Sequence, residues 1–222
     1  MASLARRTAP IWAVLVLLAA DSTKPAPQAA GPGRVEGTVA LASDSGARTA
    51  DRYTAASGET RTAQMVPAVV YLDGAVSGAP AARASGPLDL EQRGQAFVPT
   101  LLVVPVGTAV RFPNGDPVFH NVFSYSKARR FDLGRYHQGE SKTVVFDKPG
   151  YVKVMCEVHK WMRSAVFVAE NPYYGVADAQ GRFHIDAVPP GHYRLVAEQF
   201  ERRVVREIDV ADGQVTRLDI RP

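Results

Sequence analysis

Residues 149–162 read PGYVKVMCEVHKWM, the stretch with the most informative pattern in the chain. Its first half places an apolar residue at every second position up to Cys156, which is typical of a strand with one face against a core. Beyond the strand, His159 and Met162 follow Cys156 at intervals of three residues. Residues 165–169 then begin another apolar strand. The pattern predicts two β-strands joined by a short loop that carries a thiol, an imidazole and a thioether.

The same strand pattern extends outward on both sides. Over residues 88–170 short apolar runs recur between Pro, Gly and Asn or Asp, as in a β-sandwich. Residues 172–222 repeat it with turn signals at 178–181 and 188–191, and predict a second, smaller sandwich. No stretch has the 3.6-residue period of a helix, so the predicted fold class is all-β.

The first residues have the features of an export signal. Arg6 and Arg7 precede an apolar run over residues 11–20, which is too short to span a bilayer. We interpret residues 1–20 as a cleaved signal peptide, with an uncleaved anchor as the alternative. The mature chain is then periplasmic or secreted and has no membrane span. Residues 21–33 are rich in Pro, Ala and Gly and predict a linker.

Composition excludes several classes. The chain has 222 residues, a single cysteine and a net charge of +4. One cysteine cannot form an internal disulfide. The weak charge gives no reason to expect a nucleic-acid partner. Neither a carboxylate pair nor a Ser-His-Asp set stands out, so we expect no enzyme.

The loop after residue 155 predicts a metal site. Thiolate, imidazole and thioether ligands together favour copper over hard cations, and Cys156, His159 and Met162 supply one of each. His120, on a predicted strand face with Val118 and Val122, is the candidate second imidazole. Two imidazoles and a thiolate in a plane with a long axial thioether are the ligands of a blue-copper site. A zinc site or an empty, degenerate site remains an alternative.

These motifs resemble the plastocyanin-like cupredoxins. The residues that carry the resemblance are 97–99, 103–107, 110–114, 120–121 and 149–162. The Cys-x2-His-x2-Met spacing is similar to that of amicyanin. The resemblance implies an eight-strand Greek-key sandwich with one type 1 copper that shuttles a single electron, and it implies that Asn121 steadies the ligand loop. Glu157 departs from the pattern, which leaves open whether its carboxylate points at the metal or at solvent.

The second sandwich has a resemblance of its own. Residues 176–185 and 188–195 resemble the carboxypeptidase-regulatory-like, transthyretin-like module, which has no catalytic residues. Its usual opening strands match residues 35–39 and 69–72, which lie on the far side of the cupredoxin-like part. Residues 34–74 therefore either complete the second sandwich, with the cupredoxin inserted into it, or form an N-terminal extension of the cupredoxin. Residues 43–64 show no period and predict a loop.

An exported electron-transfer protein is the leading functional hypothesis. The resemblance extends to methylamine-utilisation proteins, so a dehydrogenase or a cytochrome is the kind of redox partner to expect. Copper storage or delivery is one alternative, and an envelope binding module with a cupredoxin scaffold is another. A basic stretch either steers an acidic partner or is a solvated loop; it contains Lys127, Arg129, Arg130 and Arg135. We interpret His137, His184 and His192 as surface residues.

Overall fold

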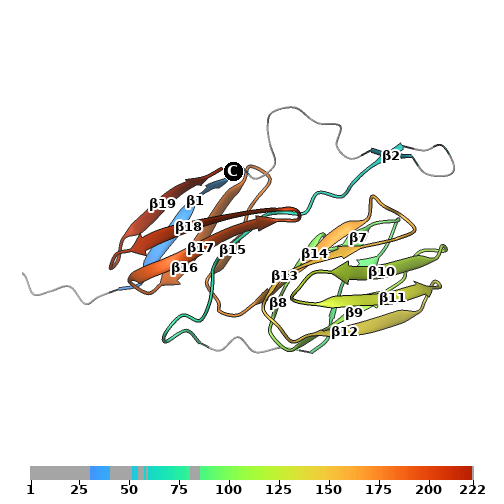
Figure 1. Cartoon of the computed structure of the whole chain (residues 1–222), viewed down its shortest axis with the longest axis horizontal. Coiled ribbons are helices and arrows are strands. Elements are labelled where there is room, and N and C mark those ends of the chain that lie inside the picture. Colours follow the sequence, from blue (N-terminus) through green and yellow to red (C-terminus); the bar gives the residue numbers. More distant parts are fainter. Residues whose placement is uncertain (1–30, 41–51, 55–57, 59, 81–85, 222) are drawn as a thin grey trace, which may run out of the picture. The chain divides into compact units, whose positions relative to one another are not determined.

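The computed structural model describes residues 31–40, 52–54, 58, 60–80 and 86–221 (Figure 1). All its regular elements are β-strands, so the predicted all-β class is confirmed. The expected signal peptide and most of the expected linker lie outside the described residues. Within the part that the structure describes, no helix has the length and the apolar character needed to cross a membrane.

Two sheets form the cupredoxin-like sandwich. The larger has the order β11 (Arg130–Tyr136), β10 (His120–Tyr125), β13 (Gly150–Met155), β14 (Arg163–Ala169) and β8 (Leu101–Pro105). The smaller has the order β12 (Ser141–Phe146), β9 (Thr108–Pro113) and β5 (Leu88–Asp89). These five and three strands give the number that the cupredoxin resemblance implies. A short hairpin of β6 (Glu91–Gln92) and β7 (Phe97–Val98) lies beside them.

Alternating side chains of the two sheets form one apolar core. From the larger sheet, Val152 and Val154 of β13 point into it, as the sequence alternation predicts. Phe112 of β9 and Phe146 of β12 meet them from the smaller sheet. Cys156, directly after β13, continues the same inward face and belongs to the same core. The strand period therefore places the thiol at the edge of a close-packed interior.

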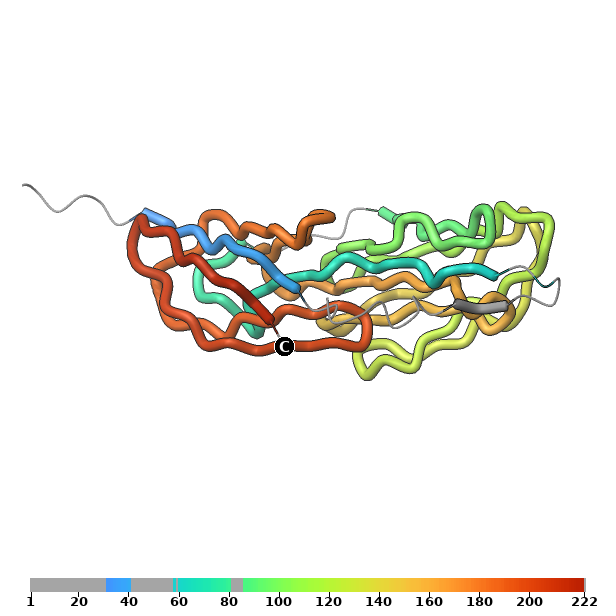
Figure 2. Tube along the Cα trace, turned by 90° about the horizontal axis from the view of Figure 1, so that it is seen from above, coloured from blue at the N-terminus to red at the C-terminus, as the bar shows by residue number. Residues whose placement is uncertain are grey.

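The second sandwich contains strands from both ends of the described chain. One sheet has the order β16 (Arg182–Val188), β1 (Gly33–Val39) and β19 (Val215–Ile220). The other has the order β15 (Tyr174–Val176), β4 (Val69–Leu72), β17 (Gly191–Gln199) and β18 (Arg202–Val210). Figure 2 shows β1 beside β19, with which it pairs in parallel. Because β1 and β4 pair with strands that follow residue 172, the pairing is the one that an inserted cupredoxin requires.

A third apolar cluster takes residues from both sandwiches. It contains Tyr71 and Val196 from β4 and β17, and Tyr151 and Phe167 from β13 and β14. Phe200, after β17, is packed against it, and its backbone N–H donates to the Tyr151 hydroxyl at 3.1 Å. The larger sheet of the cupredoxin-like sandwich and the sheet that contains β4 and β17 therefore each bury side chains on both of their faces.

Part of the predicted loop 43–64 forms a short β-hairpin. β2 (Arg52–Thr54) pairs with β3 (Thr60–Thr62) in an antiparallel hairpin, so the expectation of a loop is wrong there. Residues 43–51, 55–57 and 59 of that loop lie outside the described part. Short strands of this kind lack the apolar alternation that reveals longer ones, since they have too few residues to show a period.

The pairing of β1 with β19 predicts the effect of Gly37→Ala. A Cβ at Gly37 would clash with the Leu218 backbone carbonyl of β19. We expect the free energy of unfolding to fall by about 1–3 kcal/mol, since either strand must shift. Urea denaturation of the full chain measures it, with Gly31→Ala as the control, because nothing lies within 4 Å of a Cβ there. Equal stability of the two variants would contradict the parallel pairing.

Candidate metal centre

Neighbouring strands bring the four predicted ligands to one end of the cupredoxin-like sandwich. His120 begins β10, and Cys156 follows the last residue of β13. These strands are paired, with Phe123 opposite Met155. His159 and Met162 lie in the short loop from β13 to β14. The loop therefore starts and ends on paired strands of one sheet, which fixes both of its ends.

Three of the four side chains meet at close distances. The Nδ1 atoms of His120 and His159 lie 3.0 Å apart, and His120 Nδ1 lies 3.9 Å from Cys156 Sγ. Both distances are shorter than two metal–ligand bonds of about 2.0–2.3 Å each, so one ion can bind both atoms of either pair. One potential ligand atom from each of the three residues lies within 4.8 Å of the others. Among the described residues, no other group of three or more His, Cys, Asp or Glu side chains has this arrangement.

Met162, the fourth predicted ligand, lies in the same loop as His159. Its side chain is fully buried in the core that also contains Cys156. Its backbone N–H donates to the His159 carbonyl at 2.9 Å, which closes a tight turn. The backbone N–H of His159 in turn donates to Cys156 Sγ at 3.4 Å, which ties the loop to the sulfur atom. A cysteine sulfur, two imidazoles and a thioether are the donors that suit copper, so the residues present fit that metal.

The carboxylate of Glu157 does not join the site. Its side chain is 65% exposed and lies 3.6 Å from Arg135. The question left open by the sequence is therefore answered: Glu157 points at solvent. Because Arg135 is paired with Glu157, it adds no unpaired charge to the basic stretch.

The environment of His159 keeps its ring neutral. Burial, together with the neighbouring His120 ring, lowers the pKa of His159 to about 4. An imidazole binds a metal only through a nitrogen that carries no proton. At neutral pH no proton has to be displaced from an imidazolium before the ring can act as a ligand.

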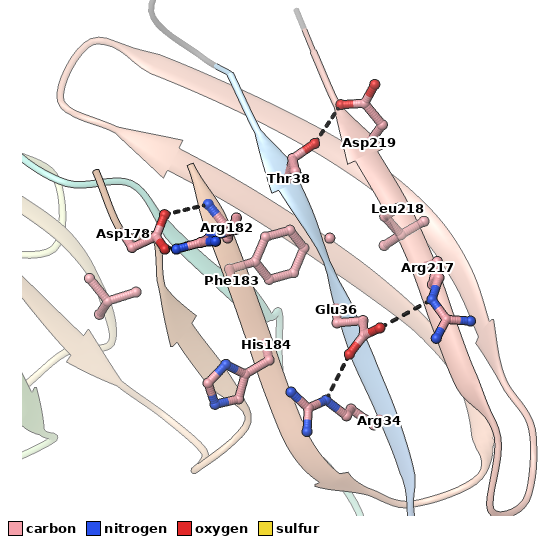
Figure 3. Close-up of a pocket in the computed structure, with 12 residues that line it drawn as sticks. Arg34, Glu36, Thr38, Asp178, Arg182, Phe183, His184, Arg217, Leu218 and Asp219 are labelled. Atoms are coloured by element: carbon pink, nitrogen blue, oxygen red, sulfur yellow. Dashed lines mark hydrogen bonds and ion pairs between the residues drawn. The ribbon is translucent and has the colours of Figure 1, made fainter. Parts of the chain in front are cut away.

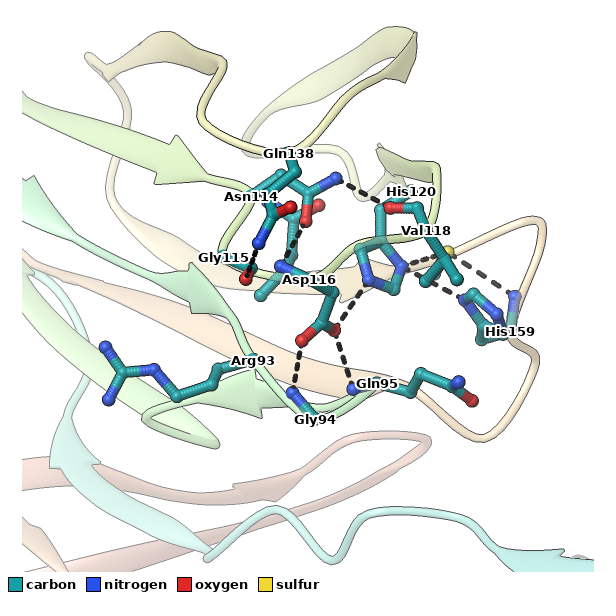
Figure 4. Close-up of polar contacts among 12 residues, drawn as sticks. Arg93, Gly94, Gln95, Asn114, Gly115, Asp116, Val118, His120, Gln138 and His159 are labelled. Atoms are coloured by element: carbon teal, nitrogen blue, oxygen red, sulfur yellow. Dashed lines mark hydrogen bonds and ion pairs between the residues drawn. The ribbon is translucent and has the colours of Figure 1, made fainter.

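Asp116 is a site residue that the sequence reasoning missed. Its Oδ2 lies 2.9 Å from His120 Nε2 (Figure 4). Burial opposes its ionisation, but hydrogen bonds from the Gln95 N–H, His120 and the Gly94 N–H outweigh that effect and hold its pKa below the usual range. Its position four residues before His120 was the available signal. It lies in an irregular loop, however, and no period predicts where a loop side chain points.

Asn121 contacts the ligand loop as the cupredoxin resemblance implies. Its Oδ1 accepts from the backbone N–H of Glu157 at 3.3 Å. Its Nδ2 donates to Asp132 Oδ1 at 2.6 Å, which fixes the amide from the other side. The residue after the first histidine therefore links β10 to the residue after the cysteine.

Gln64, in the segment between β3 and β4, forms hydrogen bonds with the ligand loop. Its backbone N–H donates to the Trp161 carbonyl at 2.9 Å. Its side-chain oxygen accepts from the Phe97 N–H at 2.8 Å and the Arg163 N–H at 3.3 Å, and its amide donates to the Phe97 carbonyl at 2.9 Å. No sequence signal points to it, because its partners lie 33 to 99 residues away.

Trp161 belongs to the core. It is buried, and its Nε1–H donates to the Gln95 carbonyl at 3.1 Å. Its ring lies 5.1 Å from that of His159, and the Arg61 guanidinium lies 5.5 Å from its centroid. Its burial and its hydrogen bond place Trp161 in the core and not in an exposed docking patch.

The remaining charged candidates lie on the surface. Arg129 is 3.5 Å from Asp147 and is compensated by it, whereas Arg130 lies over the Tyr125 ring and keeps its charge. His137 packs against Phe119 with 4.1 Å between ring centroids. His184 and His192 are exposed and face carboxylates of Asp186 and Asp209, respectively. They belong to different sheets, and neither lies in the metal-ligand cluster.

A separate pocket lies over the sheet β16-β1-β19 (Figure 3). Its volume is about 780 Å³, and ion pairs line it. Glu36 lies between Arg34 at 3.0 Å and Arg217 at 3.1 Å, and Arg182 lies 2.8 Å from Asp178. These charges compensate one another, and the pocket contains none of the four predicted ligands.

Part of this chain is similar to solved structures of copper proteins. No protein-family profile and no curated protein matches the chain. The chain is similar to the copper-containing nitrite reductase from Thermus scotoductus SA-01, with 27% identity and a TM-score of 0.37 over 43% of this chain. It is similar to a purple cupredoxin from Nitrosopumilus maritimus, with 25% identity and a TM-score of 0.33 over 38% of this chain and 100% of that one. It is similar to a Cu(I) form of amicyanin, with 20% identity and a TM-score of 0.36 over 45% of this chain and 98% of that one.

These likenesses have clear limits. The chain spans 27% of the nitrite reductase, whose activity remains a property of that protein. At these TM-scores, the chemistry of the site has to be derived from the residues of this chain. None of the three is named as a transthyretin-like protein, so that identity of the second sandwich stays a prediction.

The contacts of Gln64 predict the effect of Gln64→Ala. The substitution leaves the Phe97 N–H and carbonyl without their side-chain partner. We expect a loss of about 1–3 kcal/mol in the free energy of unfolding, the usual effect of unsatisfied buried groups. Urea denaturation measures it. Gln138→Ala is the control, because that exposed amide makes one bond, to the Gly115 carbonyl. A loss in the control as large as in Gln64→Ala would show that Gln64 does not hold the loop.

Proposed function

We propose that this protein is an exported carrier of single electrons with one type 1 copper bound by His120, Cys156, His159 and Met162. The observation that carries the proposal is the convergence of three donor atoms, within 4.8 Å of one another, from β10 and the loop after β13. Met162, buried beside them, supplies the thioether. When bound there, copper supplies a one-electron couple between Cu(II) and Cu(I).

The protein holds the ligands in one arrangement. Cys156 and Met162 belong to the close-packed core, and both ends of the ligand loop are fixed by strand pairing. A rigid ligand set suits electron transfer, because little has to move when the charge of the metal changes. The same rigidity disfavours copper delivery, in which the ligands have to open for exchange.

His159 is the proposed route for the electron. Its Nδ1 faces His120, so its other ring edge points away from the ligand cluster. The side chains of Val118, Phe119 and Val158 at this end are partly exposed and apolar. We propose that they form a docking surface for a redox protein, either a dehydrogenase or a cytochrome. Since two of the four basic residues, Arg129 and Arg135, are paired with carboxylates, electrostatic steering by the basic stretch is expected to be weak.

The export expected from the sequence agrees with the proposed site. Residues 1–20 carry the signal-peptide pattern, and a lone thiol is unusual in an oxidising compartment unless something binds it. A copper thiolate is such an occupant. We therefore propose a periplasmic or secreted location.

Copper addition tests the proposal. Cu(II) added to the purified mature protein is expected to give an intense thiolate-to-copper absorption band and narrow copper hyperfine splitting in the EPR spectrum. Cys156→Ser removes the only thiolate, so both signals should disappear. His184→Asn is the matched control, since that exposed imidazole lies outside the cluster and should leave both signals unchanged. A colourless wild-type protein would overturn the copper assignment.

Voltammetry of the copper-loaded protein separates the functions. A carrier of electrons should give a reversible one-electron wave and keep its copper through repeated cycles, because the ligand set does not rearrange. Loss of copper on reduction would instead favour storage or delivery. A protein that binds no copper, yet folds, would favour a binding module with a cupredoxin-like scaffold.

A further inference from the structure

The two ring nitrogens of His120 face different partners. Nδ1 lies 3.0 Å from His159 Nδ1 and 3.9 Å from Cys156 Sγ, on the side of the metal cluster. Nε2 lies 2.9 Å from the Asp116 carboxylate on the opposite side. The His120 ring is fully buried, so neither nitrogen has solvent as an alternative partner. The Asp116 side chain is itself only 8% exposed.

Asp116 accepts hydrogen bonds on both of its oxygens. The Gly94 N–H donates to Oδ1 at 2.6 Å, and the Gln95 N–H donates to Oδ2 at 2.7 Å (Figure 4). Two backbone donors at this distance favour the ionised carboxylate, which has no proton to give. Its contact with His120 therefore requires the ring proton on Nε2. The lone pair of the neutral ring is then on Nδ1, which faces the metal cluster.

We propose that Asp116 is a positioning residue of the metal centre, which fixes Nδ1 of His120 as the ligand atom and lowers the reduction potential of the bound copper. The inference rests on the proposed copper function and deepens it. A carboxylate behind a ligand imidazole makes the imidazole a stronger donor. A stronger donor and a nearby negative charge stabilise Cu(II) more than Cu(I). Because Asp116 is buried, salt in the solvent screens this effect only weakly.

The carboxylate is held so that it cannot turn away. The Asp116 backbone N–H donates to Asn114 Oδ1 at 2.9 Å, which fixes the loop before β10. Gln95, which donates to Asp116, accepts the Trp161 Nε1–H at 3.1 Å through its carbonyl. Trp161 lies against the His159 ring. The turn between β6 and β7 thus connects the environments of the two imidazoles through Asp116.

The reduction potential of Asp116→Asn tests the proposal. Asparagine has nearly the same shape and can still accept from the turn, but it is uncharged. We expect the preference of the site for Cu(II) over Cu(I) to fall about tenfold, which raises the potential of a one-electron couple by about 59 mV. Asp89→Asn is the matched control, because it removes the same charge from an exposed residue paired with Arg111. Asp116→Glu keeps the charge, and its potential should stay near that of the wild type.

The tautomer of His120 gives a second readout that needs no metal. Nitrogen-15 NMR of the wild-type apoprotein should show the His120 proton on Nε2. It needs no variant, so it tests the orienting role even if Asp116→Asn does not fold.

The outcomes distinguish the two proposals. A proton on Nδ1, or an Asp116→Asn protein that is less stable but has an unchanged potential, would overturn the role of Asp116. A wild-type protein that binds no copper would instead overturn the proposed function and leave the tautomer to decide whether Asp116 orients His120.

Discussion

The strand β14 is buried on both of its faces, and this burial fixes its register in the sheet. Val166 and Val168 point into the core of the cupredoxin-like sandwich, whereas Ala165, Phe167 and Ala169 point into the cluster shared with the second sandwich. The strand also pairs with β13 on one edge and with β8 on the other. A slip of one residue would exchange the two sets of side chains, so the register is strongly specified. The metal-ligand loop ends where this strand begins.

The geometry of the candidate site follows from that fixed register. Pairing of Met155 with Arg163 sets the distance between the two ends of the ligand loop. The loop has room for few conformations, and internal bonds from the His159 and Met162 N–H groups remove most of the rest. Conformational entropy is therefore lost on folding and not on metal binding. This is the physical reason to expect a preformed site.

The sequence predicts those parts of the site that belong to regular strands. Alternation up to Cys156 correctly predicts that its thiol points into the core, because every second side chain of a strand lies on the same face. The resemblance of residues 35–39 to the opening strand of the transthyretin-like module predicts a strand there, and β1 pairs with β16 and β19, which follow the cupredoxin-like part. The strand period, however, does not show which residue from a distant part of the chain a side chain contacts. Asp116 in a loop, and Gln64 with partners up to 99 residues away, lie beyond any local pattern.

Opposite charges flank the two imidazoles, and they come from different parts of the chain. The Asp116 carboxylate lies behind His120, within the cupredoxin-like sandwich. The Arg61 guanidinium lies over Trp161, beside His159, and its charge contributes to the low pKa of that histidine. Arg61 precedes Gln64 on the segment that continues into β4 of the second sandwich. With copper bound as proposed, a nearby cation would favour Cu(I) and a nearby anion would favour Cu(II), so the Arg61 and Asp116 charges would act in opposite directions on the reduction potential.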